Sequence, residues 1–322
     1  MQLLEATDKN IAYAAEIIKN GGLVSFPTET VYGLGADGLN PIASARIFEA
    51  KNRPAFNPLI LHIADKETLG KIADWENSNV EKLIAKFWPG PLTLVLPKKK
   101  IVPEIVTAGN PTVAVRMPNH DVALKLIKLA GTPIAAPSAN RFGQLSPTEA
   151  PHVVKQLKNR VDVILNGGKC EVGVESTILE ITGDDIFLLR HGGLPLEEIE
   201  AVVGKVKTKP HNTAKPNSPG QLLFHYSPTI PLKFLSAATL TEYSGKRIGA
   251  IFFKKKSFDG TFALEKILST GGDLREAAAN LFAFLHEFEK ENIDVILIEP
   301  VEETGLGRAI MDRLRKASNK YL

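Results

Sequence analysis

The sequence predicts an α/β fold with a large, twisted mixed sheet, followed by a smaller α/β domain. Short apolar strands alternate with helical patterns over the first two hundred residues, and several strands then follow one another without an intervening helix. Strands joined without a crossover helix pair antiparallel, which favours a mixed sheet over a purely parallel one. A polar, proline-rich segment then separates this part from a second strand and helix pattern. The 322 residues are enough for two domains.

In the first part, buried-type strands are bounded by Gly, Pro and Asn. We expect them at residues 23–26, 59–63, 93–96, 112–116, 134–136, 163–165, 176–181 and 186–189. Helical patterns lie near residues 42–50, 79–87, 121–130 and 147–159. Asn40-Pro41 predicts the start of the first helix, because Asn caps free amide groups and Pro suits the first helical position. Trp88-Pro89-Gly90-Pro91 predicts the end of the second.

The composition changes after residue 204. Residues 205–230 are polar, rich in proline and without periodicity, so we expect a linker there. Beyond it, residues 247–253 and 295–298 are buried-type strands, and helical patterns lie near residues 273–289 and 307–318. The predicted layout is therefore a larger α/β domain at 1–204, a linker at 205–230 and a smaller, Rossmann-like α/β domain at 231–322.

The composition is that of a globular protein, with 44% hydrophobic and 23% charged residues. A net charge of +3 tolerates polyanionic partners without requiring them. Since Cys170 is the only cysteine, an intramolecular disulfide and a cysteine zinc site are excluded, and the histidines lack metal-ligand spacing. We expect no protein-bound metal site. The sequence contains no apolar stretch of membrane-spanning length and no basic leader, so we expect a cytoplasmic protein.

Two common nucleotide-binding motifs are disfavoured. Residues 33–38 formally match G-x-G-x-x-G, but six residues separate Gly33 from the preceding strand, and the next strand carries no acid at its end. A dinucleotide fingerprint needs its first glycine directly after the strand and an acid at the end of the next strand. The sequence contains no G-x-x-x-x-G-K-[ST], which excludes a P-loop nucleotidase.

Residues 25–35 and the following helix predict a site for a phosphorylated or carboxylated small molecule. Two threonine hydroxyls, of Thr28 and Thr30, follow the first strand, and nearby glycines allow a ligand to approach the backbone closely. Lys51 and Arg53 then place two cations at the end of a helix, which suits a phosphate clamp. The alternative is that they only complement the helix dipole.

Two further candidates lie on predicted strands. Arg116 ends a strand beside a loop, a position that suits carboxylate recognition and equally suits a surface ion pair. His62 lies in an apolar strand, where a hydrogen-bonded core histidine is the default interpretation.

Small polar side chains follow the later strands. Ser138 and Asn140 occupy alternate positions after a buried strand, so they point the same way if the chain stays extended, and a turn is the alternative. Ser146 precedes a helical pattern, where it would cap the helix or touch an anion. Ser176 opens a strand, and Arg190 closes the next one beside two glycines.

Taken together, these segments resemble the YrdC-like L-threonylcarbamoyladenylate synthases in their two-domain form. Matching segments in the first part are residues 26–37, 51–53, 57–62, 87–94, 113–118, 136–140, 174–179 and 189–193. Matching segments in the second part are Ser218-Pro219-Gly220, His225-Tyr226-Ser227-Pro228 and residues 305–314. The resemblance implies a YrdC-like mixed-sheet fold. It also implies a nucleotidyltransferase that makes threonylcarbamoyladenylate and pyrophosphate from L-threonine, bicarbonate or CO2, and ATP, for threonylcarbamoyladenosine modification of tRNA.

The resemblance also implies roles for individual residues. Those implied for L-threonine are Thr30, His62, Arg116, Ala136 (through its backbone) and Ser176. Those implied for ATP are Lys51, Arg53, Asn57, Thr112, Ser138, Asn140, Ser146 and Arg190, with Tyr226 reaching back from the linker. Of these, Lys51, Arg53, Ser138 and Asn140 would cradle the reacting phosphates and carry catalysis, which is positioning and electrostatic stabilisation and needs no protein nucleophile.

Mg²⁺ would enter with ATP, held mainly by phosphate oxygens and water. A tRNA-modifying threonylcarbamoyltransferase system would act downstream. The alternative function is a double-stranded RNA or tRNA binding module without adenylation activity, which predicts binding that weakens steeply with salt. A carbamoyl-transfer enzyme acting on a protein substrate is a third interpretation, which the absence of further zinc-ligand or acylphosphatase-like segments disfavours.

Overall fold

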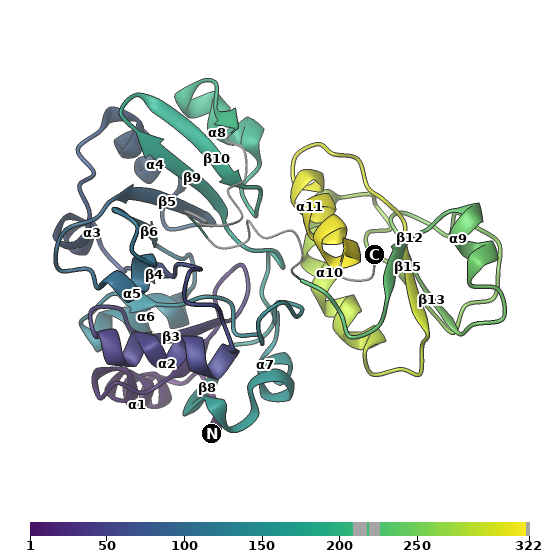
Figure 1. Cartoon of the computed structure of the whole chain (residues 1–322), viewed down its shortest axis with the longest axis horizontal. Helices are drawn as coiled ribbons and strands as arrows, with labels where there is room; N and C mark the ends of the chain where they lie inside the picture. The colour runs from purple at the N-terminus through teal and green to yellow at the C-terminus, as the bar shows by residue number, and fades with distance from the viewer. Residues whose placement is uncertain (209–217, 219–225, 320–322) are drawn as a thin grey trace.

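The computed structural model describes residues 1–208, 218 and 226–319, and it contains a large domain and a small domain (Figure 1). The large domain is built on an eleven-stranded sheet of order β1-β8-β2-β3-β7-β4-β6-β5-β9-β10-β11. Its strands are β1 (Gln2–Glu5), β2 (Val24–Phe26), β3 (Gly33–Asp37), β4 (Ile60–His62), β5 (Leu92–Pro97), β6 (Thr112–Arg116), β7 (Ile134–Ala135), β8 (Val163–Asn166), β9 (Thr177–Thr182), β10 (Asp185–Arg190) and β11 (Lys207–Thr208).

This sheet is mixed, as predicted. Strand β4 pairs parallel with β6 and antiparallel with β7, while β9 and β10 form an antiparallel pair. The three-residue strand β4 is central, and its register sets His62 opposite Arg116 at the ends of β4 and β6. Two candidate site residues from separate segments of the sequence are therefore neighbours at the ends of adjacent strands.

Helices cover both faces of the large sheet. They are α1 (Asp8–Lys19), α2 (Pro41–Lys51), α3 (Lys66–Ile72), α4 (Ser78–Phe87), α5 (Glu104–Thr107), α6 (Asp121–Ala130), α7 (Ala150–Leu157) and α8 (Leu196–Val203), with a 3₁₀ turn at Lys158–Arg160. Alternate residues of β8 enter different cores: Ile164 packs in the cluster that contains Ile47 of α2, and Leu165 packs in the cluster that contains Leu126 of α6. The sheet is thus buried on both faces, which accounts for its nearly continuous apolar strands.

The small domain has a four-stranded, all-parallel sheet of order β12-β15-β13-β14. Its elements are β12 (Leu232–Phe234), α9 (Ala237–Glu242), β13 (Ile248–Phe252), β14 (Leu264–Ile267), α10 (Leu274–Phe288), β15 (Val295–Ile298) and α11 (Gly307–Ser318). A parallel sheet with crossover helices agrees with the Rossmann-like prediction. Figure 1 shows α10 and α11 on the side of this sheet that faces the large domain.

The two domains meet through buried polar contacts. His286 of α10 donates from Nε2 to the carbonyl of Ser146 at 3.1 Å, and its ring stacks on that of His152 at 3.9 Å. From α11, Arg313 reaches Glu175 of the large domain at 2.8 Å. Contacts of this kind fix the small domain against the large one at defined points.

Several predicted elements match closely, and others were missed. Asn40 caps α2 by accepting from the amides of Ile42 and Ala43, as predicted. The predicted helix at 147–159 is shorter, since α7 begins at Ala150, so the expectation that Ser146 caps it is wrong. Instead, the segment before α7 is extended, and its Pro147 carbonyl accepts from the amide of Tyr32 at 2.9 Å. The sequence analysis did not anticipate the helices α1, α3, α5, α8 and α9 or the short strands β1, β3, β11, β12 and β14.

The predicted linker is only partly described. Its first residues contribute β11, which pairs with β10 at the edge of the large sheet. Most of the remaining linker, including Pro219-Gly220 and His225, lies outside the described residues. The division at residues 204 and 230 therefore stays a prediction.

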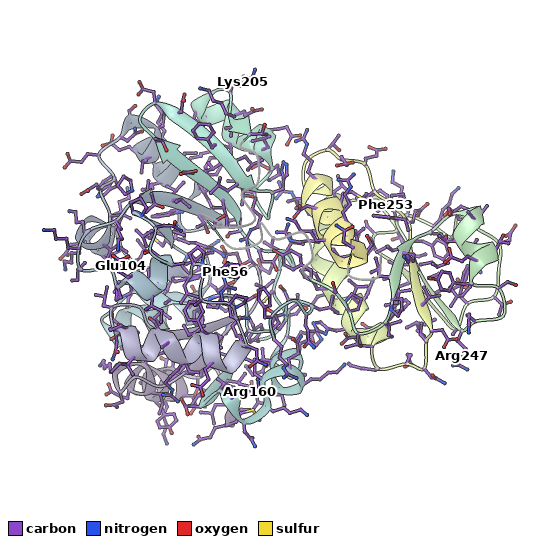
Figure 2. All side chains as sticks on the ribbon, viewed as in Figure 1. Phe56, Glu104, Arg160, Lys205, Arg247 and Phe253 are labelled. Atoms are coloured by element: carbon purple, nitrogen blue, oxygen red, sulfur yellow. The ribbon has the colours of Figure 1, made fainter. Side chains whose placement is uncertain are left out.

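The surface of the described chain carries scattered charges. Arg160, Lys205 and Arg247 are exposed and lie well apart on the molecule (Figure 2). Among the described residues, no helix is both long enough and apolar enough to cross a lipid bilayer.

Candidate active site

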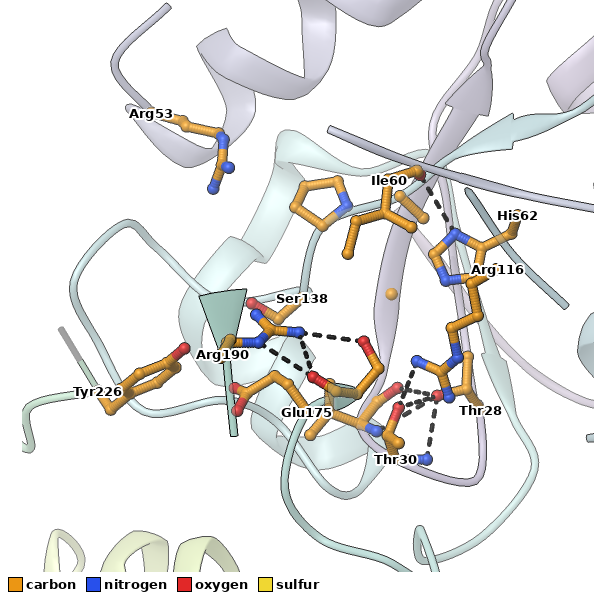
Figure 3. A pocket seen from close by; sticks show the side chains of 15 residues that line it. Thr28, Thr30, Arg53, Ile60, His62, Arg116, Ser138, Glu175, Arg190 and Tyr226 are labelled. Carbon is orange, nitrogen blue, oxygen red and sulfur yellow. Dashed lines mark hydrogen bonds between the residues drawn. The ribbon is translucent and has the colours of Figure 1, made fainter. Parts of the chain in front are cut away.

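A buried cavity lies where loops following several strands of the large sheet converge with the linker (Figure 3). Most of the lining side chains are polar or charged although they are shielded from solvent. The lining residues are Thr28, Thr30, Val31, Gly33, Arg53, Ile60, His62, Arg116, Ala136, Pro137, Ser138, Glu175, Ser176, Arg190 and Tyr226.

One end of the cavity is organised by Arg116, the last residue of β6. Its Nη1 donates to Thr30 Oγ1 at 2.9 Å and its Nε to the carbonyl of Gly90 at 3.2 Å. Its Nη2 lies 2.7 Å from Glu29 Oε2 as an ion pair, although the two groups are not aligned for a hydrogen bond. A buried guanidinium held from behind in this way is suited to bind the planar carboxylate of a ligand.

His62 lies beside Arg116 and is neutral. Burial, and next the positive charge of Arg116, lower the pKa of His62 to about 3. Its Nδ1 lies 3.3 Å from the carbonyl of Ile60, and a carbonyl can only accept, so Nδ1 carries the proton. This tautomer leaves Nε2 as a hydrogen-bond acceptor for an ammonium or hydroxyl group.

The opposite end of the cavity holds Arg53 and Arg190. Arg53 is anchored by its own loop, since Nε donates to the carbonyl of Asn57 at 3.1 Å and Nη2 to that of Pro58 at 2.8 Å. Burial and the nearby charge of Arg190 lower the pKa of Arg53 to about 9, with Tyr226 acting against them. Two buried guanidinium groups that line one cavity repel each other, and an anion bound between them relieves this repulsion, so this end of the cavity suits a phosphate.

Arg190 also organises the wall formed by Ser176. Its Nε and Nη2 donate to the carbonyl of Ser176 at 3.0 and 2.9 Å, and Nη2 lies 3.1 Å from the Ser176 hydroxyl. The Ser176 hydroxyl also meets that of Thr93 on β5 at 2.7 Å. Ser176 is thereby held between the arginine end and the neighbouring strand.

Glu175 is the acid among the lining residues, and it is ionised. Burial alone would raise its pKa, but Arg313, Arg190 and the hydroxyl of Ser146 outweigh burial and hold the pKa below its usual value. Oε1 accepts from Ser146 Oγ, and Oε2 accepts from Arg313 Nε. Both oxygens of this carboxylate are therefore engaged by protein groups.

Lys51 and Asn140 lie behind the cavity wall and shape it. Lys51 Nζ donates to the carbonyls of Ser138 and Asn140, the first at 2.6 Å. The Asn140 amide donates to the carbonyls of Arg141 and Gln144, both at 2.9 Å. These contacts hold the loop that presents Ser138 to the cavity.

Nine of the predicted site residues come together on the cavity: Thr30, Arg53, His62, Arg116, Ala136, Ser138, Ser176, Arg190 and Tyr226. The amide of Ala136 already donates to the carbonyl of Ile60, so a backbone contact to a ligand would use its carbonyl. His62 is buried and within hydrogen-bond distance of a carbonyl, as its default interpretation expected, and it also lines the cavity.

Five predicted residues do not line the cavity: Lys51, Asn57, Thr112, Asn140 and Ser146. Asn57 is buried beside Arg53, and neither of its amide atoms has a hydrogen-bond partner among the described residues. Thr112 begins β6, four residues from Arg116, which is about 13 Å along a strand. The Ser146 hydroxyl donates to the Glu175 carboxylate, and Ser146 does not line the cavity.

Sequence reasoning did not select Glu29, Glu175 or Arg313 as site residues. Each acid directly precedes a selected residue, Thr30 or Ser176, and that adjacency was the available signal. No sequence signal pointed to Arg313, because its partner Glu175 is 138 residues away in the chain.

Comparisons with known proteins agree with this arrangement. Residues 16–192 match the Sua5/YciO/YrdC family model, described as "Telomere recombination", and residues 194–319 match "Threonylcarbamoyl-AMP synthase, C-terminal domain". The chain is 46% identical to the threonylcarbamoyl-AMP synthase of Pyrococcus abyssi, with 96% of this chain and 94% of that protein covered. It is 43% identical to the enzyme of the same name from Bacillus subtilis, with 98% and 94% covered.

A solved structure shares the whole architecture. The crystal structure of P. abyssi Sua5 with L-threonine has a TM-score of 0.92 and 44% identity, covering 99% of this chain and 98% of that one. These matches confirm the resemblance drawn from the sequence segments. The chain belongs to the threonylcarbamoyl-AMP synthase family, in the form that carries the additional C-terminal domain.

Proposed function

We propose that this protein makes threonylcarbamoyl-AMP and pyrophosphate from L-threonine, bicarbonate or CO2, and ATP. The observation that carries the proposal is one buried cavity with Arg116 and neutral His62 at one end and Arg53 with Arg190 at the other. The first pair suits an amino acid, and the second suits a polyphosphate. Full-length relatives with this activity in their names support the same conclusion.

The amino-acid end accounts for how threonine would be held. Arg116 would bind its carboxylate, and the Nε2 of His62 and the hydroxyls of Thr30 and Ser176 would receive its ammonium and hydroxyl groups. A site that hydrogen-bonds the substrate hydroxyl discriminates against analogues that lack it. We therefore propose that threonine selection depends on these small polar groups.

The reaction needs charge stabilisation more than a nucleophilic side chain. The threonine ammonium first loses a proton to solvent. The free amine then bonds to the carbon of CO2 with release of a second proton, or to that of bicarbonate with release of water, and gives a carbamate. A carbamate oxygen then attacks the α-phosphorus while the bond to the β-phosphate breaks and pyrophosphate leaves. Arg53 and Arg190 supply buried positive charge for the phosphoryl oxygens, and Ser138 supplies a hydroxyl.

We also propose that ATP binds with Mg²⁺. Among the described lining residues the one carboxylate, Glu175, is already engaged by Ser146 and Arg313, so it is not a ready metal ligand. The hydroxyls of Thr28, Thr30 and Ser138 fit an ion that is held mainly by phosphate oxygens and water. When bound, the ion would neutralise charge on the triphosphate.

The product would pass to a tRNA-modifying threonylcarbamoyltransferase system in the cytoplasm. A mixed anhydride is reactive towards water, so a transferase that consumes it promptly is required. The alternative of an RNA-binding module is disfavoured, because the converging charges lie in a buried cavity and not on an exposed sheet face.

Pyrophosphate release tests the proposal. We expect release from ATP only when threonine and bicarbonate are both present, and omission of any substrate should abolish it. Release that is independent of threonine would contradict the assignment. Salt-sensitive RNA binding without pyrophosphate release would favour the alternative function.

A further inference from the structure

Helix α11 of the small domain places a buried arginine against the active site. Arg313 is 1% exposed, and all three of its guanidinium nitrogens are engaged. Nε donates to Glu175 Oε2 at 2.8 Å, Nη1 to Asp312 at 2.5 Å, and Nη2 to the carbonyl of His191 at 3.0 Å. Two of these acceptors belong to the large domain, so Arg313 joins the domains at the wall of the cavity.

The same guanidinium also packs on the linker. It lies over the ring of Tyr226 at 4.8 Å from the centroid, and the ring of Phe282 of α10 lies 5.9 Å from Tyr226. Tyr226 has φ of 64°, a left-handed conformation that a bulky residue adopts only when its surroundings hold it. Arg313 and Phe282, both from the small domain, provide such surroundings.

The charge of Arg313 has a second consequence for the cavity. Glu175 lines the same wall as Arg190, where a triphosphate would add further negative charge. A buried carboxylate without a counter-charge there would repel the phosphates and draw on the positive charge of Arg190. Arg313 balances Glu175 from outside the cavity, so the charge of Arg190 stays directed to the ligand.

We propose that Arg313 is a positioning residue of the active site, through which the small domain holds Glu175 and Tyr226 in place for ATP. This inference rests on the proposed adenylation activity. It gives residues in the last helix a defined part in the reaction, because Arg313 holds two residues that line the cavity, Glu175 and Tyr226. The contact acts through other residues, since Arg313 itself does not line the cavity.

Arg313→Gln tests the inference in the full chain, with pyrophosphate release as the assay. We expect the KM for ATP to rise roughly tenfold or more and the KM for threonine to change far less. The double variant Arg313→Gln/Glu175→Gln should recover part of the loss, because Glu175→Gln removes the negative charge that Arg313→Gln leaves without a partner. Such recovery is a readout that general destabilisation of the small domain would not give selectively for ATP.

Two further variants make the result decisive. Arg315→Gln is the matched control, since Arg315 lies two residues on in α11, is half exposed and pairs with Glu303. It should behave as the unmodified protein. If Arg313→Gln fails to fold, Arg313→Lys keeps the charge but loses the fork, and it should still raise the KM for ATP.

The outcomes separate this inference from the proposed function. An unmodified protein that releases no pyrophosphate would overturn the adenylation activity itself. An active protein whose Arg313 variants match the Arg315→Gln control would overturn the inference alone. Additive losses in the Arg313→Gln/Glu175→Gln variant would also overturn it, because they would show that the two residues act independently.

Discussion

His62 and Arg116 are register partners on adjacent parallel strands, and each is the last residue of its strand. Their pairing puts a neutral acceptor beside a fixed cation in a buried space. The charge of Arg116 in turn helps to keep His62 neutral, as the lowered pKa of His62 shows. A ligand with an anionic end and a donor group nearby satisfies both residues at once, and an amino acid is such a ligand.

Arg116→Lys should weaken threonine binding selectively. Lysine keeps the charge but cannot donate to Thr30 and Gly90 while presenting a planar fork to a carboxylate. We expect the KM for threonine to rise by roughly tenfold or more, equivalent to about 1.4 kcal/mol, with the KM for ATP nearly unchanged. Steady-state kinetics with each substrate varied measures both. Arg46→Lys, an exposed site on α2, is the control, and equal effects on both substrates would refute a carboxylate role for Arg116.

Arg53→Met should affect the chemical step. Methionine fills much of the same space but removes the charge and the contacts to the carbonyls of Asn57 and Pro58. If Arg53 faces developing charge on the phosphates, the loss of transition-state stabilisation should be about 2–4 kcal/mol. Single-turnover pyrophosphate release would report it. A rate within about twofold of the unmodified protein would mean that Arg53 only supports its loop, and Arg160→Met gives the exposed comparison.

Strand-end residues were predictable because strand position alone determines where they lie. A residue that closes a buried strand must emerge where the strand ends, so Arg116 and Arg190 were found from local pattern. His62 was not, because its expected strand ran on to residue 63, whereas β4 ends at His62. The orientation of Lys51 was not predictable in this way. It ends a helix beside Arg53, and only the tertiary fold decides that its ammonium turns to the carbonyls of Ser138 and Asn140.

Ion pairs between the two domains could not be predicted from the sequence either. A spacing rule describes neighbours on one element, whereas Glu175 and Arg313 lie 138 residues apart and are brought together where the two domains pack against each other. The same holds for the extended segment at Ser146, whose course is set by contacts with Tyr32 and His286. Local signals there suggested a helix cap, and tertiary contacts overrode them.

Acid should weaken the contact between the domains through Glu289. Burial would raise its pKa, but the His286 ring 3.8 Å away, the hydrogen bond from the amide of Thr229 and the ion pair with Lys155 outweigh burial and lower the pKa to about 2. Because the folded-state pKa is depressed, the stabilisation is present above the ordinary value of 4.5 and is lost as the pH falls towards 2. The full linkage is about 3 kcal/mol at most.

Glu289→Gln gives the measurement for this pH effect. The difference in unfolding free energy between the two proteins should be constant above about pH 5.5 and should shrink as the pH falls below the ordinary pKa. Chemical denaturation at a series of pH values measures it. Glu303→Gln, at an exposed pair with Arg315, serves as comparison. A difference in unfolding free energy that does not change with pH would show that the charge of Glu289 contributes nothing to stability.

Lys51→Met separates support of the cavity wall from direct action on phosphates. Burial, and next the charge of Arg53, lower the pKa of Lys51 well below its usual value, while its ammonium is held by the Ser138 and Asn140 carbonyls. Removing it leaves buried carbonyls without their donor, which costs roughly 1–3 kcal/mol of stability. We therefore expect Lys51→Met to lose both stability and activity.

Ser138→Ala is the matched variant on the same loop. Its backbone carbonyl can still accept from Lys51, so the loss of unfolding free energy should be limited to about 1 kcal/mol for the hydrogen bond from Ser138 Oγ to Asn140 Oδ1. Loss of the hydroxyl that lines the cavity should lower activity. Denaturation and pyrophosphate release on both variants distinguish the two effects. Support of the wall and stability of the loop depend on the same two hydrogen bonds of Lys51. If Lys51→Met kept its stability but lost activity, the result would therefore indicate that Lys51 acts directly on the phosphates.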